Sequence, residues 1–252
     1  MNLLQAQLIF PTHAVPAAGP LPSGAEKLEV VTPGGERLRG AYFPPRGGEN
    51  ERTLVLGFGG NGWNGQHVGE YLARTFPQAH VVAFHYRGYH PSTGNPSAEA
   101  LKEDAPLVFD HAAALVKPDK VVAVGLSIGS GVAANLARHR RLDGLILVTP
   151  FDSLKAVASE IFPWVPVGPF FKHELATAED IAEVNVPVAV LAAEQDEIVH
   201  PRRTVALRRA VPNLIFDRTI DRAGHNDIYQ RKEFEGAMNE AFCKLTSGQN
   251  PR

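Results

Sequence analysis

Three residues of this chain have the types and the order that nucleophilic attack by a serine requires. Ser127 lies at the centre of residues 125–129, which read G-x-S-x-G, and Asp196 and His225 follow it along the chain. A serine hydroxyl is a weak nucleophile at neutral pH unless a nearby base accepts its proton and a carboxylate orients that base. We therefore expect Ser127 to be the nucleophile and His225 the general base, with Asp196 among the candidates for the orienting acid.

The G-x-S-x-G pattern stands between a predicted strand and a predicted helix. An apolar, β-branched run at 121–124 precedes it, and small residues compatible with a helix follow at 130–137. This strand–turn–helix context is typical of a nucleophile elbow, in which a tight turn exposes the serine at the tip of a strand. Bulky side chains two residues before or after would collide across the turn, and Gly125 and Gly129 avoid that collision. The context therefore predicts a nucleophile, which the pattern alone would not.

Several acidic residues could orient the base. Glu194, Asp196 and Glu197 all follow a predicted strand at 186–192, and Asp152 follows the strand before it. Asp152 is interpreted as the cap of a helix that begins beside it, since short polar side chains favour that position. Residue type and order leave the other three open.

One histidine fits the base best. His225 lies in a short, glycine-flanked loop after the last predicted strand, which is where a Ser, acid, His chain order places it. His200 is too close to the end of the preceding strand, and His173 lies in an irregular insertion.

Composition excludes some classes of partner. The chain has 252 residues, a net charge of −2 and 44% hydrophobic residues, so it can bury a large core and offers nucleic acid no basic stripe. Arg87 is expected to pair with a carboxylate near its loop, and Asp104 to lie in solvent or cap a helix. The single cysteine, Cys243, has no disulfide partner and is expected to be at least half buried in the last helix.

The N-terminal residues carry no clear targeting signal. No apolar run reaches the roughly 18–20 residues that a membrane-spanning helix needs. Residues 1–22 lack a basic start and are interrupted by prolines, which is unlike a signal peptide. We expect residues 1–27 to form an extended arm on the surface of one domain covering residues 1–252, in the cytoplasm.

Strands and helices alternate along most of the chain, which predicts an α/β fold with a mostly parallel sheet of about eight strands and helices on both faces. The expected strands are at 28–32, 37–43, 53–58, 80–84, 121–124, 144–148, 186–192 and 214–220. The expected helices are at 65–76, 98–116, 130–137, 202–210 and 230–246. An irregular, aromatic segment at 150–180 interrupts the alternation and is expected to form a short cap.

Four segments carry a resemblance to the α/β-hydrolase superfamily, and within it to small, lid-poor esterases that include protein depalmitoylases and lysophospholipases. Residues 59–64 stand where that branch has H-G-N-A-G-N, and residues 86–97 are similar to its Y-R-G-Y-G-x-S-x-G-x-P-S loop. Residues 196–199 match D-E-I-V, which selects Asp196 as the acid, and residues 224–227 match G-H-N-D.

The sequence departs from that pattern at four positions. Gly59 replaces a usual His, Trp63 a usual Gly and His85 a usual Asp, and His200 stands before the proline of D-E-I-V-P. None of these positions belongs to the candidate triad.

The resemblance implies a serine hydrolase without metal or cofactor that cleaves esters or thioesters, with short to medium acyl chains, through an acyl-enzyme. The backbone N–H groups of Ile128 and Asn61 would form the oxyanion hole, with Gly60 as the alternative to Asn61. A peptidase or amidase with the same triad, or a catalytically silent binding protein of this fold, remains an alternative.

The substrate is expected to be a small or acylated molecule held by residues near the elbow. Gly60 and Trp63 belong to the loop after the third strand, and Phe162 and Trp164 to the aromatic cap segment. Apolar walls with few polar groups are typical of small-molecule pockets, so the cap segment is expected to form the acyl-side wall.

Overall fold

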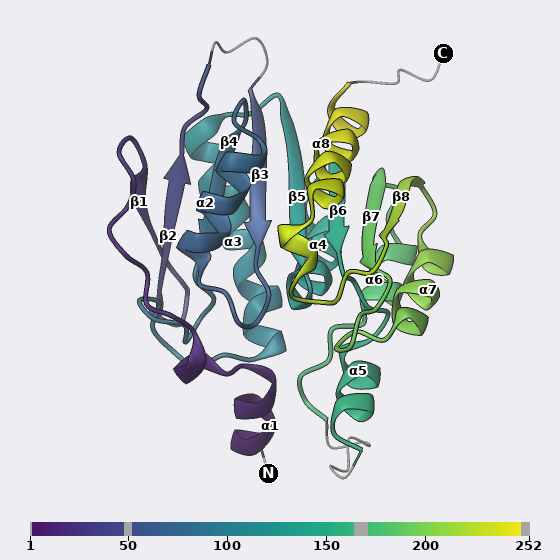
Figure 1. Cartoon of the computed structure of the whole chain (residues 1–252). Coiled ribbons are helices and arrows are strands. Elements are labelled where there is room, and N and C mark those ends of the chain that lie inside the picture. Colours follow the sequence, from purple (N-terminus) through teal and green to yellow (C-terminus); the bar gives the residue numbers. More distant parts are fainter. Residues whose placement is uncertain (1, 48–51, 164–170, 248–252) are drawn as a thin grey trace.

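A single mostly parallel sheet organises the described part of the chain (Figure 1), which comprises residues 2–47, 52–163 and 171–247 of the computed structural model. Eight strands of these residues form it in the order β1-β2-β4-β3-β5-β6-β7-β8. β1 pairs antiparallel with β2, and β2 with β4, whereas all later neighbours are parallel. The strands are β1 (Glu26–Val31), β2 (Arg37–Phe43), β3 (Thr53–Phe58), β4 (His80–Phe84), β5 (Lys120–Leu126), β6 (Gly144–Val148), β7 (Val188–Ala193) and β8 (Leu214–Ile220).

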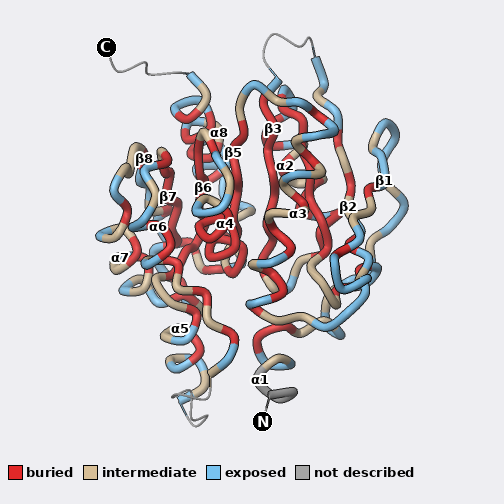
Figure 2. Tube along the Cα trace, turned by 180° about the vertical axis from the view of Figure 1, so that it is seen from behind, coloured by how far each residue is buried: buried red, intermediate tan, exposed pale blue. Residues whose placement is uncertain are grey.

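The central strands are apolar because helices cover both faces of the sheet. In β3, Leu54 and Leu56 belong to the hydrophobic cluster on one face and Val55 to the cluster on the other, as the two-residue period of a strand requires. Figure 2 shows the result: the central strands are buried, while exposed residues gather on the hairpin β1–β2 and the outer helices. The predicted α/β fold is confirmed.

The helices form two layers. α2 and α8 pack on one face, and α3, α4, α6 and α7 lie on the other. Within the described ranges no helix combines the length and the apolar character needed to cross a membrane. These helices are α2 (Gly65–Thr75), α3 (Ala98–Val116), α4 (Ile128–His139), α6 (Thr177–Ala182), α7 (Pro201–Ala210) and α8 (Lys232–Thr246).

The expectation for Cys243 is wrong, because its side chain is exposed. α8 turns Phe242 and Leu245 into the core, and a residue beside Phe242 on a helix points about 100° away from it. Cys243 therefore belongs to the solvent face of α8.

The N-terminal segment is not the extended arm that the prolines predict. α1 (Asn2–Ile9) is a helix, and a short 3₁₀-helix, η1 (Thr12–Ala14), follows it. Residues 2–9 contain no glycine or proline, and the good helix formers among them favour a helix. The prolines of this segment interrupt helical structure only after Phe10. Ile9 and Phe10 are buried in the core, which anchors the end of the helix.

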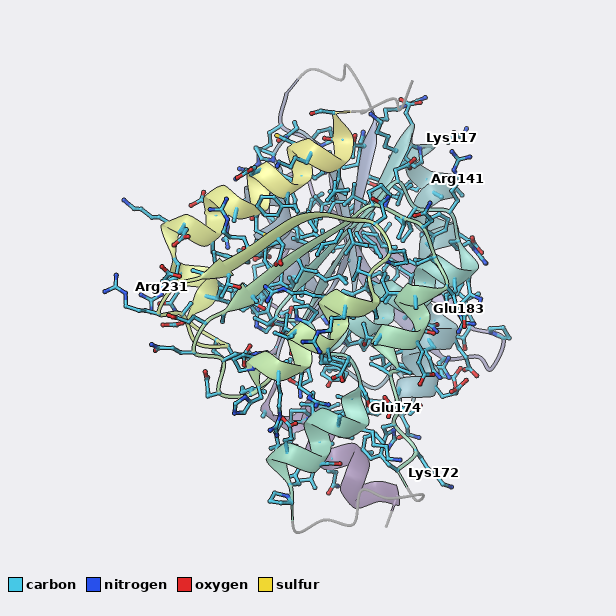
Figure 3. The ribbon with its side chains drawn as sticks, turned by 90° about the vertical axis from the view of Figure 1, so that its right-hand side faces the viewer. Lys117, Arg141, Lys172, Glu174, Glu183 and Arg231 are labelled. Carbon is cyan, nitrogen blue, oxygen red and sulfur yellow. The ribbon has the colours of Figure 1, made fainter. Side chains whose placement is uncertain are left out.

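The cap segment is more regular than expected, because it contains α5 (Leu154–Ile161). Its N-cap is Ser153, whose hydroxyl accepts from the Ala156 N–H, rather than Asp152. Glu174 reinforces this end of the helix: its carboxylate accepts from the Ser153 hydroxyl at 3.1 Å and from the Lys155 N–H at 3.2 Å. Figure 3 shows Glu174 against α5, while Lys172 points away from it.

Candidate active site

The turn between β5 and α4 has the geometry of a nucleophile elbow. Ser127 has φ 52° and ψ −117°, a conformation that L-residues rarely adopt. Its N–H donates to the Val148 carbonyl at 2.9 Å, and its own carbonyl accepts from the Ser130 N–H at 2.9 Å and hydroxyl at 2.6 Å. These bonds hold the backbone in the strained conformation that turns the hydroxyl away from the strand.

The two glycines of the pattern are required by close approach across the turn. A Cβ at Gly125 would lie 2.5 Å from the Gly129 carbonyl oxygen, and a Cβ at Gly129 would lie 2.1 Å from the Phe58 carbonyl oxygen. Both distances are far below van der Waals contact. The G-x-S-x-G pattern therefore reflects how tightly β5, α4 and the end of β3 pack around Ser127.

The three candidate triad residues meet at the carboxyl ends of the parallel strands. His225 Nε2 lies 2.9 Å from Ser127 Oγ, and His225 Nδ1 lies 2.8 Å and 2.9 Å from the two carboxylate oxygens of Asp196. His225 and Asp196 are 5% and 6% exposed, so water hardly competes for these bonds. The arrangement can pass a proton from the hydroxyl to an imidazole that the carboxylate orients.

The acid and the base are themselves held in place. Asp196 Oδ1 accepts from the backbone N–H of Ile198 at 3.0 Å and of Val199 at 2.7 Å. The neighbouring Glu197 accepts from the backbone N–H of His225 at 3.0 Å. This role of Glu197 has no signal in the sequence, because the bond joins two loops that meet only in the folded protein.

The competing acids point elsewhere. Asp152 accepts from Arg203 at 3.1 Å, and Glu194 accepts from the backbone N–H of Arg222 at 2.7 Å. Within the described residues Asp196 is the carboxylate that bonds to the His225 ring.

The candidate oxyanion donors flank Ser127. Among the described residues, no bond engages the backbone N–H of Ile128, at the first turn of α4, or that of Asn61, in the loop after β3. That loop lies against the elbow: a Cβ at Gly60 would be 3.7 Å from Ser127 Cβ. Unpaired N–H groups beside the hydroxyl can stabilise a negative charge that develops there.

A pocket of about 170 Å³ opens at Ser127 and His225. It includes the predicted contacts Gly60, Trp63 and Phe162, whereas the prediction for Trp164 lies outside the described residues. Among the residues that the structure describes, no lysine or arginine lines it. The lining comprises Leu8, Ile9, Gly60, Asn61, Gly62, Trp63, Ser127, Ile128, Phe151, Leu154, Val157, Ala158, Ile161, Phe162, Ile198, Val199, His225, Asn226 and Tyr229.

Aromatic rings support one side of this pocket. Trp63 packs against Tyr229 with ring centroids 5.0 Å apart and against Tyr71 at 5.7 Å. Burial raises the pKa of the Tyr229 hydroxyl well above its ordinary value, so the ring is neutral at physiological pH. The replacement of a usual glycine by Trp63 is thus accommodated by tilted and edge-on packing against these two rings. The sequence did not point to Tyr229, which precedes the last helix without a motif of its own.

His85, another departure from the family pattern, supports the loop from behind. Its Nδ1 accepts from the backbone N–H of Gly65, at the start of α2, at 3.3 Å. Burial lowers the pKa of the ring to about 4, so the imidazole is neutral and can accept this bond.

The comparisons agree with this architecture. A family model of the alpha/beta hydrolase fold matches residues 54–184, and the chain belongs to that family. It is 31% identical over 231 residues to an uncharacterized protein of Mycobacterium tuberculosis, an alignment covering 88% of this chain and 81% of the relative.

Two further relatives carry named activities. The lysophosphatidylserine lipase ABHD12 of Danio rerio is 32% identical over 138 residues, which is 48% of this chain and 36% of the lipase. An esterase of Pyrococcus furiosus superposes with a TM-score of 0.69 at 16% identity, covering 93% of this chain and 97% of the esterase, and shows the shared fold. Fold and relatives together support a hydrolase.

Proposed function

We propose that this protein is a serine hydrolase that cleaves carboxylic esters or thioesters through an acyl-enzyme. The single observation that carries the proposal is the buried, hydrogen-bonded chain from Ser127 through His225 to Asp196. A protein that used this fold only to bind ligands would have no need to keep all three groups in register and the serine in a strained conformation.

In the acylation step, Ser127 Oγ attacks the carbonyl carbon of the substrate while His225 Nε2 accepts the hydroxyl proton. The carbonyl oxygen becomes an oxyanion, which accepts from the N–H groups of Ile128 and Asn61. Asp196 stabilises the imidazolium that forms. The tetrahedral intermediate collapses as the imidazolium gives its proton to the departing alkoxide or thiolate.

In the deacylation step, His225 accepts a proton from water, whose oxygen attacks the acyl carbon of the Ser127 ester. The same oxyanion donors stabilise the second tetrahedral intermediate. Proton return to Ser127 Oγ releases the carboxylic acid and restores the enzyme.

The pocket supports short to medium acyl groups. The described residues that line it are mainly aliphatic and aromatic and include no lysine, arginine, aspartate or glutamate, and its volume of about 170 Å³ suits a chain of several methylenes. One relative is named a lysophosphatidylserine lipase, which supports an acylated molecule as the class of substrate.

A fluorophosphonate probe tests the proposal directly. Wild type should be labelled and should hydrolyse p-nitrophenyl acetate, whereas Ser127→Ala should be unlabelled and lose about 10⁴-fold or more in activity, because triad members act as a unit. Ser159→Ala is the matched control, since Ser159 is an exposed serine on α5 whose hydroxyl donates to the Lys155 carbonyl at 2.8 Å, and it does not line the pocket. Equal labelling of Ser127→Ala and wild type would refute the assignment.

A further inference from the structure

The N-terminal segment, residues 2–22, lies beside the candidate active site. Leu8 and Ile9, at the end of α1, line the same pocket as Ser127 and His225. Figure 1 shows α1 and α5 projecting from the end of the sheet where the parallel strands finish, and Figure 2 shows the same from behind. A segment that sequence alone places on the outside thus faces the reacting group.

Side-chain amides after β3 fix this segment in place. Asn61 Nδ2 donates to the Ile9 carbonyl at 2.8 Å, and Asn64 Nδ2 donates to the Pro16 carbonyl at 2.9 Å. Gln66 Nε2 donates to the Gly19 carbonyl at 3.1 Å. Three successive anchors along the segment make a positioned element rather than a loosely lying tail.

The segment also reaches the cap on the other side of the pocket. Phe10, which is 2% exposed, packs edge-on against the His173 ring with centroids 5.5 Å apart. Burial lowers the pKa of His173, so this contact is between two uncharged rings. The segment therefore bridges the loop that carries Asn61 and the cap that carries α5.

The rim of the pocket is apolar where the two helices meet solvent. Leu8 is 37% exposed and Ile161 of α5 is 38% exposed, and both line the pocket. Ile9, by contrast, is 7% exposed and lies deeper. Ile9 therefore borders the buried inner part of the pocket, whereas Leu8 and Ile161 border its mouth.

We infer that the N-terminal segment is a wall of the acyl site, and that Ile9 and Leu8 determine which acyl chain lengths are accepted. The inference rests on the proposed function for the identity of the reaction but on the pocket geometry for the role of the wall. Ile9 limits the depth of the site. Leu8 covers the part of a bound acyl chain that lies at the mouth of the pocket.

Chain-length profiles on p-nitrophenyl esters from acetate to dodecanoate test the wall. Each methylene that finds apolar contact should raise kcat/KM about fourfold. Ile9→Ala should move the preferred length up by about two carbons, and Leu8→Ala should lower the preference for the best ester over acetate about fivefold. Leu115→Ala is the matched control, because Leu115 is a similarly exposed leucine on α3 away from the pocket.

A binding measurement separates failure of the wall from failure of the proposed reaction. Ser127→Ala, alone and combined with each substitution, is titrated with fatty acid methyl esters of increasing length. The readout is tryptophan fluorescence, to which Trp63 in the pocket contributes. If the two substitutions change the length dependence of binding as predicted for turnover, the wall is supported even if wild type hydrolyses no ester. Absence of hydrolysis would reject only the proposed reaction. Unchanged profiles in folded Leu8→Ala and Ile9→Ala, in turnover and in binding, would overturn the inference.

Discussion

Replacement of Asp196 by asparagine isolates the role of one charge in the candidate triad. In the structure Asp196 Oδ1 accepts from two backbone N–H groups, those of Ile198 and Val199. An amide at this position must place its oxygen there, because its NH₂ group cannot accept. The NH₂ group then faces His225 Nδ1 and donates to it. The imidazole is forced to carry its proton on Nε2, where it can no longer accept one from Ser127.

The expected loss follows from this tautomer. The equivalent exchange in serine proteases costs about 10⁴-fold in kcat. Because two backbone N–H groups fix the orientation of the side chain here, we expect a loss of roughly 10³–10⁴-fold. That corresponds to about 4–5 kcal/mol of transition-state stabilisation. The loss should fall on kcat, with little change in KM, since Asp196 does not line the pocket.

The assay is steady-state hydrolysis of p-nitrophenyl acetate by wild type, Asp196→Asn and the control Asp152→Asn, with circular dichroism to establish that each is folded. Asp152 bonds to Arg203 and should tolerate the exchange within threefold. Retention of a tenth or more of wild-type kcat by Asp196→Asn, or an equal loss in Asp152→Asn, would refute the reasoning.

Two further predictions concern stability. The folded protein holds the pKa of His85 at about 4 against an ordinary value of 6.5, so the unfolded chain takes up a proton first as pH falls and stability is lost between those values. In His85→Asn the amide oxygen can replace Nδ1, and this variant should lose about 2–3 kcal/mol less free energy of unfolding than wild type between pH 7 and 4.5, measured by urea unfolding. An equal loss in wild type and variant would count against this prediction. Gly129→Ala should lower the free energy of unfolding by about 3 kcal/mol or more, because the new Cβ would lie 2.1 Å from the Phe58 carbonyl oxygen. Gly236→Ala, in open space on α8, should raise it by up to about 1 kcal/mol, and thermal and urea unfolding measure both variants. Similar stability of the two glycine variants would show that the elbow can relax.

Local signals explain why much of the fold could be predicted. Continuous apolar runs such as β3 and β6 are long enough to specify a buried strand, and their predicted bounds agree with the structure. The turn at 125–129 needs glycine at two positions for steric reasons that act within a few residues. The contact between Asp196 and His225 is long-range, but the parallel topology brings the ends of β7 and β8 together.

The missed features depend on contacts between distant segments. Ile9 lines the pocket because Asn61, far along the chain, bonds its carbonyl. The sequence predicts that Asp104 lies in solvent or caps a helix, yet Asp104 is 6% exposed and pairs with Arg87 through two hydrogen bonds. The sequence does predict that Arg87 pairs with a carboxylate, but nothing local shows that this carboxylate is buried. A charged residue near a helix start has the same sequence signature whether a distant arginine covers it or water does.

The conformation of Ser127 has a consequence for how this fold can diverge. A backbone at φ 52° and ψ −117° costs of order 1–3 kcal/mol for an L-residue, a sizeable part of the roughly 5–15 kcal/mol that keeps a domain folded. Glycine at this position would relieve that strain, so keeping a serine here lowers the stability of the fold. Once selection for catalysis ceased, descendants of this chain would drift toward glycine at position 127. The identity of that residue in any descendant would record whether the lineage still depended on turnover.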